Sequence, residues 1–238
     1  MDNKKYIGWK NWSENSFGIV RPGSRFYFNQ IFKPTLKNKS KTLEIGFGNG
    51  ELLNYFSANH HYTVGIEINH ELVARAKSSG YLAYAGPPWD IIELQSEKFD
   101  LIAAFSVIEH MDFKQLSKLF VWVGSHLSDG GKFYVLFPEG SSPFGLANQN
   151  GDFTHLTSLT KPKIEVLCDV GNMELLSYYD EPLSSNKLCS WGLAGKMGLL
   201  LLQWYASAIK FVLRILFFPL TTSLKLSVNS IAVMTLRK

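Results

Sequence analysis

The sequence predicts an α/β fold built on a doubly wound, mainly parallel sheet. Short apolar segments rich in β-branched residues alternate with amphipathic segments through residues 42–182. Alternation of strands and helices in this way produces a parallel sheet with helices on both faces. The chain has 238 residues and 46% hydrophobic residues, which is enough for one such domain with an elaboration.

The expected strands are short and lie at fairly regular intervals. They are placed near residues 42–46, 62–68, 81–85, 99–106, 132–137, 175–179 and 230–236. Helices between them are expected to begin near Gly50, His70, Pro88 and Asp112, and two more should cover Arg25 to Phe32 and Lys161 to Gly171. The helix from Asp112 should end at Asp129-Gly130-Gly131, because glycine is a strong helix stop signal.

The most specific motif directly follows the first strand and reads T-L-E-I-G-F-G-N-G-E-L-L. Its glycines Gly46, Gly48 and Gly50 occupy alternate positions, and Glu44 precedes the first by two residues. Glycine lets a backbone turn sharply and approach a ligand closely. A dinucleotide site has G-x-G-x-x-G spacing, which sets a pyrophosphate on the helix N-terminus. The alternate spacing therefore indicates a ligand without that pyrophosphate.

Two later strands add polar residues at their carboxyl ends. Glu67 ends the second strand, where a carboxylate can accept hydrogen bonds from both hydroxyls of a ribose. The alternative is a solvated acid at a strand end. The fourth strand begins F-D-L-I-A-A-F and ends V-I-E-H-M. Its nearly continuous apolar run is typical of a central strand buried on both faces.

These three motifs together resemble class I S-adenosylmethionine-dependent methyltransferases, in the branch that acts on small molecules and in polysaccharide biosynthesis. The resemblance covers residues 42 to about 180. It implies a Rossmann-like sheet of about seven strands whose last strand is antiparallel, with S-adenosylmethionine as cofactor. The cofactor-binding residues that it implies are Glu44, Gly46, Gly48, Gly50, Glu67, Ile68, Trp89, Asp90 and Phe105.

The end of the third strand departs from the family pattern. The family often places an acid here, near the adenine amine, whereas this chain has Gly86 and Pro87. We expect Asp90 or a backbone group to serve instead, with Trp89 offering an apolar face to the adenine. The alternative is that the prolines only start the next helix, since proline suits a first helical turn, and that Trp89 belongs to the core.

Candidate catalytic residues follow strands four and five. They are His110, Asp152 and His155, and the last two lie in a D-F-T-H stretch that resembles methyltransferases of surface-polysaccharide synthesis. A histidine suits removal of a hydroxyl proton near neutral pH. The alternatives are that His110 only shapes the cofactor pocket and His155 only stabilises its loop. No ligand spacing predicts a metal site, and the two cysteines form no framework.

Three functions follow from these motifs. The first is O-methylation of a sugar hydroxyl in a surface glycan, with a lipid-linked glycan as one form of the acceptor. The second is methylation of a quinone or another lipid. The third, of another class, is a non-catalytic scaffold that binds the cofactor, which the intact glycine turn and Glu67 argue against.

Charge is distributed unevenly along the chain. Residues 1–41 contain nine basic and two acidic residues, residues 42–182 eight and eighteen, and residues 183–238 seven and none. Basic flanks around an acidic centre indicate an anionic partner. No RNA-binding signature is present, so an anionic membrane surface or glycan is expected rather than nucleic acid. The apparent lack of a signal peptide favours a cytoplasmic protein, either free or peripheral on the inner membrane face.

We expect four segments along the chain. Residues 1–41 form a basic, aromatic-rich segment that packs on the core, residues 42–182 the methyltransferase core, residues 183–226 a hydrophobic helical insertion, and residues 227–238 the closing strand.

The insertion contains an apolar run, residues 196–220, of membrane-spanning length. Lys210 and Arg214 would be costly inside a bilayer, so a span is disfavoured. The expected alternatives are a helix that lids the pocket or forms a homodimer contact, and a helix lying in a membrane interface with both charges turned toward water. In the interfacial arrangement the side chains entering the lipid are Trp204, Phe211, Phe217 and Phe218.

Overall fold

A seven-stranded sheet forms the centre of the molecule in the computed structural model, which describes residues 8, 10, 12–37, 39–59, 62–217 and 225–237. The strands are β1 Lys41–Ile45, β2 Tyr62–Glu67, β3 Leu82–Ala85, β4 Phe99–Phe105, β5 Leu127–Pro138, β6 Met173–Asp180 and β7 Asn229–Leu236. Their order in the sheet is β3-β2-β1-β4-β5-β7-β6. β7 runs antiparallel to both β5 and β6, and the other pairings are parallel. The expected sheet with an antiparallel last strand is confirmed.

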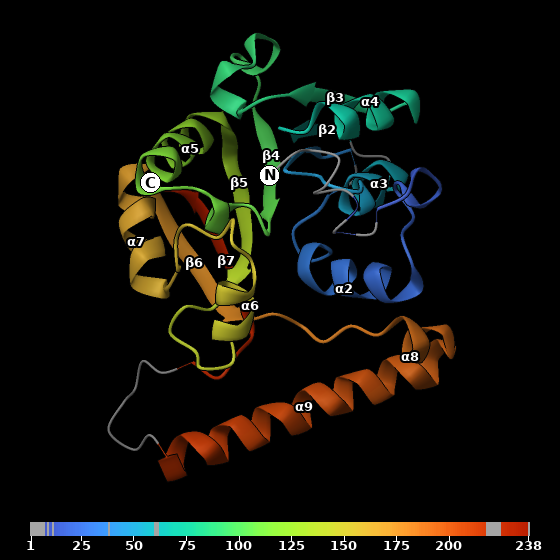
Figure 1. Ribbon diagram of the computed structural model, residues 1–238, viewed down its shortest axis with the longest axis vertical. Helices are drawn as coiled ribbons and strands as arrows, with labels where there is room; N and C mark the ends of the chain where they lie inside the picture. The colour runs from blue at the N-terminus through green and yellow to red at the C-terminus, as the bar shows by residue number, and fades with distance from the viewer. Residues whose placement is uncertain are drawn as a thin grey trace.

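Helices cover both faces of this sheet (Figure 1). The α-helices are α2 Pro22–Phe32, α3 Glu51–Ala58, α4 His70–Ser78, α5 Phe113–His126, α6 Leu146–Gly151, α7 Lys161–Val170, α8 Asn186–Ser190 and α9 Gly192–Phe217. Short 3-10 turns are η1 Glu14–Ser16, η2 Pro88–Asp90, η3 Ile92–Leu94 and η4 Ile108–His110.

Alternation along β4 explains the double layer. Leu101 and Ala103 point into the apolar cluster formed with α2 and α3, whereas Ile102 and Ala104 point into the cluster formed with α5 and α7. All four side chains are fully buried. Because successive residues of a strand face opposite sides, an uninterrupted apolar sequence is what a strand covered on both faces requires.

Two local expectations were wrong. A helix was expected from Pro88, but the chain forms only the two short turns η2 and η3, because Ile91 between them is extended (φ −91°, ψ 106°). The buried side chains of Ile91 and Leu94 hold this irregular segment on the core. The Asp129-Gly130-Gly131 sequence was expected to end a helix, but α5 ends at His126, and β5 has already begun at Leu127. Pairing between β4 and β5 is irregular here, which the positive φ of Gly130 accommodates.

The long helix α9 lies outside both helical layers, at the bottom of Figure 1. It joins the rest of the protein through polar contacts, since Gln203 Nε2 donates to Oε1 of Gln30 at 3.4 Å, and Lys210 pairs with Asp180 at 2.7 Å. The sequence had suggested that Lys210 faces water, but its side chain turns toward the protein. No helix within the described ranges combines the length and apolar character that a membrane crossing demands.

Candidate active site

The glycine turn follows β1 at the centre of the sheet, where the strand order reverses between β1 and β4. Open α/β sheets bind ligands at this switch point, outside the carboxyl ends of their strands. Gly46, Gly48 and Gly50 all have positive φ, at 73°, 51° and 73°. Residues with a Cβ rarely adopt this conformation, so all three glycines are required by the turn's geometry.

Neighbouring side chains also approach this turn closely. A Cβ built on Gly46 would lie 2.3 Å from Cγ2 of Val107, just beyond β4, and one on Gly48 would lie 2.7 Å from the ring of Trp12. Phe17 similarly packs against Gly50. Residues 12–18 therefore cover the turn, an arrangement that sequence reasoning missed because only a general abundance of aromatic residues pointed to it.

Glu67 reaches the turn from the end of β2. Its Oε2 accepts a hydrogen bond from the Gly48 backbone N–H at 3.0 Å, and its Oε1 accepts one from Asn69 N–H at 3.1 Å. Burial raises the pKa of Glu67, although these backbone hydrogen bonds oppose the rise. The carboxylate is thus fixed beside the glycine turn, while the next side chain, Ile68, is 74% exposed.

Glu44 is a buried acid beneath the same turn. Glu44 is only 5% exposed, and within the described part of the chain its Oε2 has no hydrogen-bond partner. Burial and then the nearby charge of Glu67 raise the pKa of Glu44 to about 8. Two adjacent acids, one of them unpaired, suit a ligand that brings hydrogen-bond donors or positive charge.

The other three expected cofactor residues contact other elements or are exposed. Phe105, at the end of β4, stacks on Phe32 of α2 with ring centroids 5.5 Å apart. Trp89 is half-buried, and its ring faces α5, where Lys118 Nζ lies 5.8 Å from the ring centroid. Asp90 is exposed at the end of η2. Because Trp89 packs toward α5, the structure agrees better with its role as a core residue than with an open face. Its contact with adenine stays a prediction.

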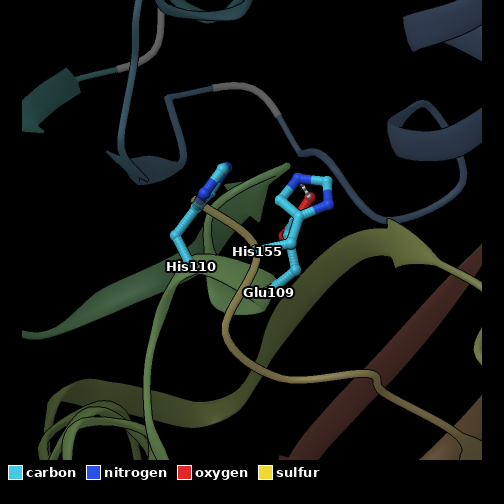
Figure 2. Close-up of side chains that lie close together, drawn as sticks. All are labelled: Glu109, His110 and His155. Atoms are coloured by element: carbon cyan, nitrogen blue, oxygen red, sulfur yellow. Dashed lines mark ion pairs between the residues drawn. The ribbon is translucent and has the colours of Figure 1, made fainter. Parts of the chain in front are cut away.

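The three expected catalytic residues come together with a fourth, Glu109. Figure 2 shows the side chains of Glu109, His110 and His155 close together. Glu109 and His110 lie on η4 beyond β4, and the loop after α6 supplies Asp152 and His155. The rings of His110 and His155 have centroids 4.6 Å apart. His155 Nε2 lies 4.0 Å from Glu109 Oε1 and 3.9 Å from Asp152 Oδ2. Glu109 directly precedes His110 in the V-I-E-H-M motif, so the sequence pointed to its position. The motif did not reveal that the Glu109 side chain is buried.

Backbone contacts fix the loop against η4. The amides of Leu156 and Thr157 both donate to the carbonyl of Glu109, at 2.9 and 3.1 Å. Thr154 donates its hydroxyl and its amide hydrogen to Oδ1 of Asp152. These bonds hold the loop after α6 against η4. The two segments are distant in sequence, since His110 and Thr154, which are in contact, are 44 residues apart.

Burial also sets the protonation of this group. It raises the pKa of Glu109 to about 7 and lowers the pKa of His110, to which nearby His155 also contributes. Burial acts to raise the pKa of Asp152, but hydrogen bonds from Thr154 and the neighbouring histidines outweigh it, and the net pKa is lowered. At neutral pH Asp152 is therefore anionic, His110 is neutral, and Glu109 is divided between its protonated and ionised forms.

Comparison with known families identifies the family of this chain. Residues 25–182 match the model of a methyltransferase domain. The chain belongs to this methyltransferase family. It is a class I enzyme that uses S-adenosylmethionine as its cofactor. A comparison with curated protein sequences finds no match.

Solved structures of methyltransferases have the same fold at low sequence identity. An S-adenosylmethionine-dependent methyltransferase from Archaeoglobus fulgidus aligns with TM-score 0.62 and 14% identity over 97% of this chain and 98% of that one. One from Clostridium acetobutylicum aligns with TM-score 0.61 and 13% identity over 99% of both chains.

The residues present fit this cofactor. S-adenosylmethionine carries a sulfonium, an ammonium and a ribose, which match the unpaired carboxylate of Glu44, the strand-end carboxylate of Glu67 and the closely approachable backbone of the glycine turn. Val107 joins the two halves of the site, because it contacts Gly46 and lies two residues before Glu109. The Glu109, His110, Asp152 and His155 group, hereafter the acceptor cluster, thus lies next to the turn.

Proposed function

We propose that this methyltransferase methylates a hydroxyl oxygen of a sugar in a surface glycan. The supporting observation is the acceptor cluster, which places two imidazoles and two carboxylates beside the glycine turn. Such groups accept hydrogen bonds, so they match an acceptor that offers several hydroxyl donors. The D-F-T-H stretch that supplies Asp152 and His155 also resembles enzymes of polysaccharide synthesis.

Methyl transfer forms an oxygen–carbon bond as the sulfonium sulfur–carbon bond breaks, and it releases the proton of the hydroxyl. His110 and His155 are the groups proposed to receive that proton, because a neutral imidazole is a suitable base near pH 7. Asp152 holds Thr154, which in turn contacts Nδ1 of His110 at 2.9 Å. Asp152 is therefore proposed to orient the base.

The acceptor is proposed to be lipid-linked, because α9 presents an apolar surface to its surroundings. Its exposed apolar side chains are Leu193, Met197, Leu200, Leu201, Leu202, Trp204, Tyr205, Ile209, Phe211, Val212, Ile215 and Leu216. Contiguous apolar surface of this kind marks an interaction site. Residues 183–238 have seven basic residues and no acid, so an anionic lipid surface at the cytoplasmic face matches the segment in both respects.

Methyl transfer to a panel of acceptors tests the function. The purified protein would be incubated with labelled S-adenosylmethionine and lipid-linked oligosaccharides, free oligosaccharides or quinone-type lipids, and the products analysed by mass spectrometry. A gain of one methyl group on a sugar oxygen is expected. Methylation of the quinone alone would replace the sugar with a lipid acceptor. Binding of cofactor without transfer to any member of the panel would mean that the acceptor belongs to another chemical class.

A further inference from the structure

The acceptor cluster contains lone pairs that lack donors. Nδ1 of His155 lies 3.1 Å from the carbonyl oxygen of Gln149, which can only accept a hydrogen bond, so Nδ1 carries the hydrogen. The proton-free nitrogen of neutral His155 is then Nε2, and this atom lies about equally far from Glu109 and Asp152, at 4.0 and 3.9 Å. Neither distance is a hydrogen bond.

The same logic fixes the tautomer of His110. Its Nδ1 lies 3.2 Å from the carbonyl oxygen of Thr154 and 2.9 Å from the Thr154 hydroxyl oxygen. That hydroxyl already donates its hydrogen to Asp152, so it too accepts from His110. Both histidines therefore use Nδ1–H on backbone carbonyls, and each keeps a bare Nε2.

A buried carboxylate completes the group. Glu109 is 1% exposed, and its Oε2 has no hydrogen-bond partner among the residues that the structure describes, while the His155 side chain is 8% exposed. One ligand atom from each of Glu109, His110 and His155 lies within 4.8 Å of the other two. Lys10 also lies nearby, with its Nζ 3.9 Å from Oδ2 of Asp152, the oxygen that faces His155 Nε2.

We propose that Glu109, His110 and His155 bind a divalent transition-metal ion, of the class that includes Zn²⁺ and Co²⁺. Two imidazoles and one carboxylate are a ligand set for such ions, whereas Mg²⁺ and Ca²⁺ prefer oxygen alone. Metal-binding histidines typically donate their other ring hydrogen to a carbonyl or carboxylate, which both histidines do here. Sequence spacing did not predict this site, because His155 comes from a distant loop.

Binding requires the cluster to contract. Ligand atoms about 2.1 Å from a shared ion lie about 3.4 Å apart in a tetrahedral site. Glu109 Oε1 and His155 Nε2 are 4.0 Å apart here, and all three ligand atoms lie within 4.8 Å of one another. Small side-chain rotations provide this change. Three protein ligands leave a coordination position open to water or to an acceptor hydroxyl, as in catalytic sites.

The use of the open position rests on the proposed function. A hydroxyl bound to the ion has a lowered pKa, so its proton can pass to water without a histidine base. Ion binding itself requires no acceptor and no turnover, so it can be measured even if the proposed sugar substrate is incorrect.

Titration with Co²⁺ tests the site directly. Untagged protein, stripped with a chelator and dialysed, would be titrated while the visible absorption of bound Co²⁺ is recorded, with displacement by Zn²⁺ as confirmation. We expect one site per chain. Glu109→Gln preserves shape but removes the charge. It should weaken binding by about 10–100-fold or more, because even loss of a residue that only orients a metal ligand has an effect of this size. His155→Asn should act similarly, and His70→Asn, at an exposed histidine of α4, is the matched control.

Circular dichroism of each variant would verify folding. Absence of a stoichiometric site in the wild-type protein, equal binding by Glu109→Gln and His70→Asn, or a response to Mg²⁺ without one to Co²⁺ would each overturn the assignment. Absence of Co²⁺ binding combined with methyl transfer that survives the chelator would leave the sugar methyltransferase intact and return the proton to a histidine.

Discussion

The backbone N–H of Gly48 donates to Oε2 of Glu67 at 3.0 Å, so a side chain from the end of β2 is joined to the turn after β1. The bond fixes the carboxylate where the loops after β1 and β2 meet. Its second oxygen is held by Asn69, which also caps α4 by accepting from the Glu71 amide. Strand, turn and helix cap are therefore coupled through one acid.

Replacing Glu67 should weaken cofactor binding. Glu67→Ala removes a charged hydrogen-bond acceptor, which should weaken binding by roughly 1–3 kcal/mol. Calorimetry with S-adenosylmethionine and its demethylated product would measure the change. Glu174→Ala, at an exposed acid of β6, is the control. Equal affinities in the two variants would remove Glu67 from the cofactor site.

Gly48→Ala should block the cofactor site. Its φ of 51° makes alanine unfavourable by about 1–2 kcal/mol, and the new methyl group would meet the Trp12 ring at 2.7 Å. Gly80→Ala is a matched control, because Gly80 has φ 84° but open space around it. Both variants should lose thermal stability, and only Gly48→Ala should lose cofactor affinity. Normal binding by Gly48→Ala would show that the ligand does not approach this turn.

Cofactor affinity should increase with pH up to about 8. The pKa of Glu44 rises from 4.5 to about 8 on folding, because burial disfavours the charged form. A cationic cofactor favours ionised Glu44, so binding below pH 8 should release a proton. The folding stability of the free protein should change with pH in the opposite direction. The contribution of protonated Glu44 is complete below about pH 4.5 and is lost as pH rises through about 8.

Calorimetry in buffers of different ionisation enthalpy would count the released proton. Glu44→Gln keeps the side-chain shape without a titrating group, so its affinity should vary little with pH. A pH dependence as steep as that of the wild-type protein would assign the proton to another group.

Substituting the two histidines should reduce turnover without affecting cofactor binding. His110→Ala and His155→Ala should bind S-adenosylmethionine normally, because the acceptor cluster lies beside the cofactor turn and not in it. At least one variant should lose about 100-fold or more in rate. Full activity in both variants would mean that neither imidazole assists the reaction, as base or as metal ligand.

The apolar surface of α9 should bind anionic liposomes. Binding should rise with the fraction of anionic lipid and fall with salt, since exposed charges are screened. Trp204→Ser combined with Phe211→Ser should reduce sedimentation with liposomes, because both side chains are mostly exposed, at 73% and 65%. Ile92→Ser, at a 77% exposed site on η3, is the control. Lys210 is a poor choice here, since its ion pair with Asp180 attaches the helix.

If wild-type protein remains in the supernatant under every lipid and salt condition, α9 does not bind membranes. Light scattering would then distinguish a homodimer, with the surface covered by a second copy, from a monomer. A dimer that Trp204→Ser and Phe211→Ser dissociate would locate the contact on α9.

Periodicity and motif spacing predicted the strands because both depend on local sequence. The apolar run of β4 and the alternate glycines correspond directly to a buried strand and a positive-φ turn. The failures arose where tertiary contacts decide the conformation. Packing against the core holds Ile91 extended and Leu94 in a single 3-10 turn. The helix-start preference of Pro88 does not reveal this packing.

The candidate site was predictable in its residue types but not in its arrangement. His110 and His155 were identified separately, but their contact depends on how the loop after α6 folds back onto η4. The tautomers depend on the backbone carbonyls of Gln149 and Thr154, which any residue type would supply, and on the Thr154 hydroxyl beside Nδ1 of His110. The packing of Trp12 over Gly48 likewise comes from a segment without a recognisable motif.

The place of β7 in the sheet has a consequence for how the protein is made. β7 lies between β5 and β6, but the ribosome synthesises it after both strands and after α9. Until β7 emerges, the edges of β5 and β6 that it will occupy have no partner strand, and unpaired edges favour aggregation. α9 is therefore exposed to the cell while the sheet is still open. Early capture of α9 by a membrane or chaperone would leave β5 and β6 time to receive their shared neighbour.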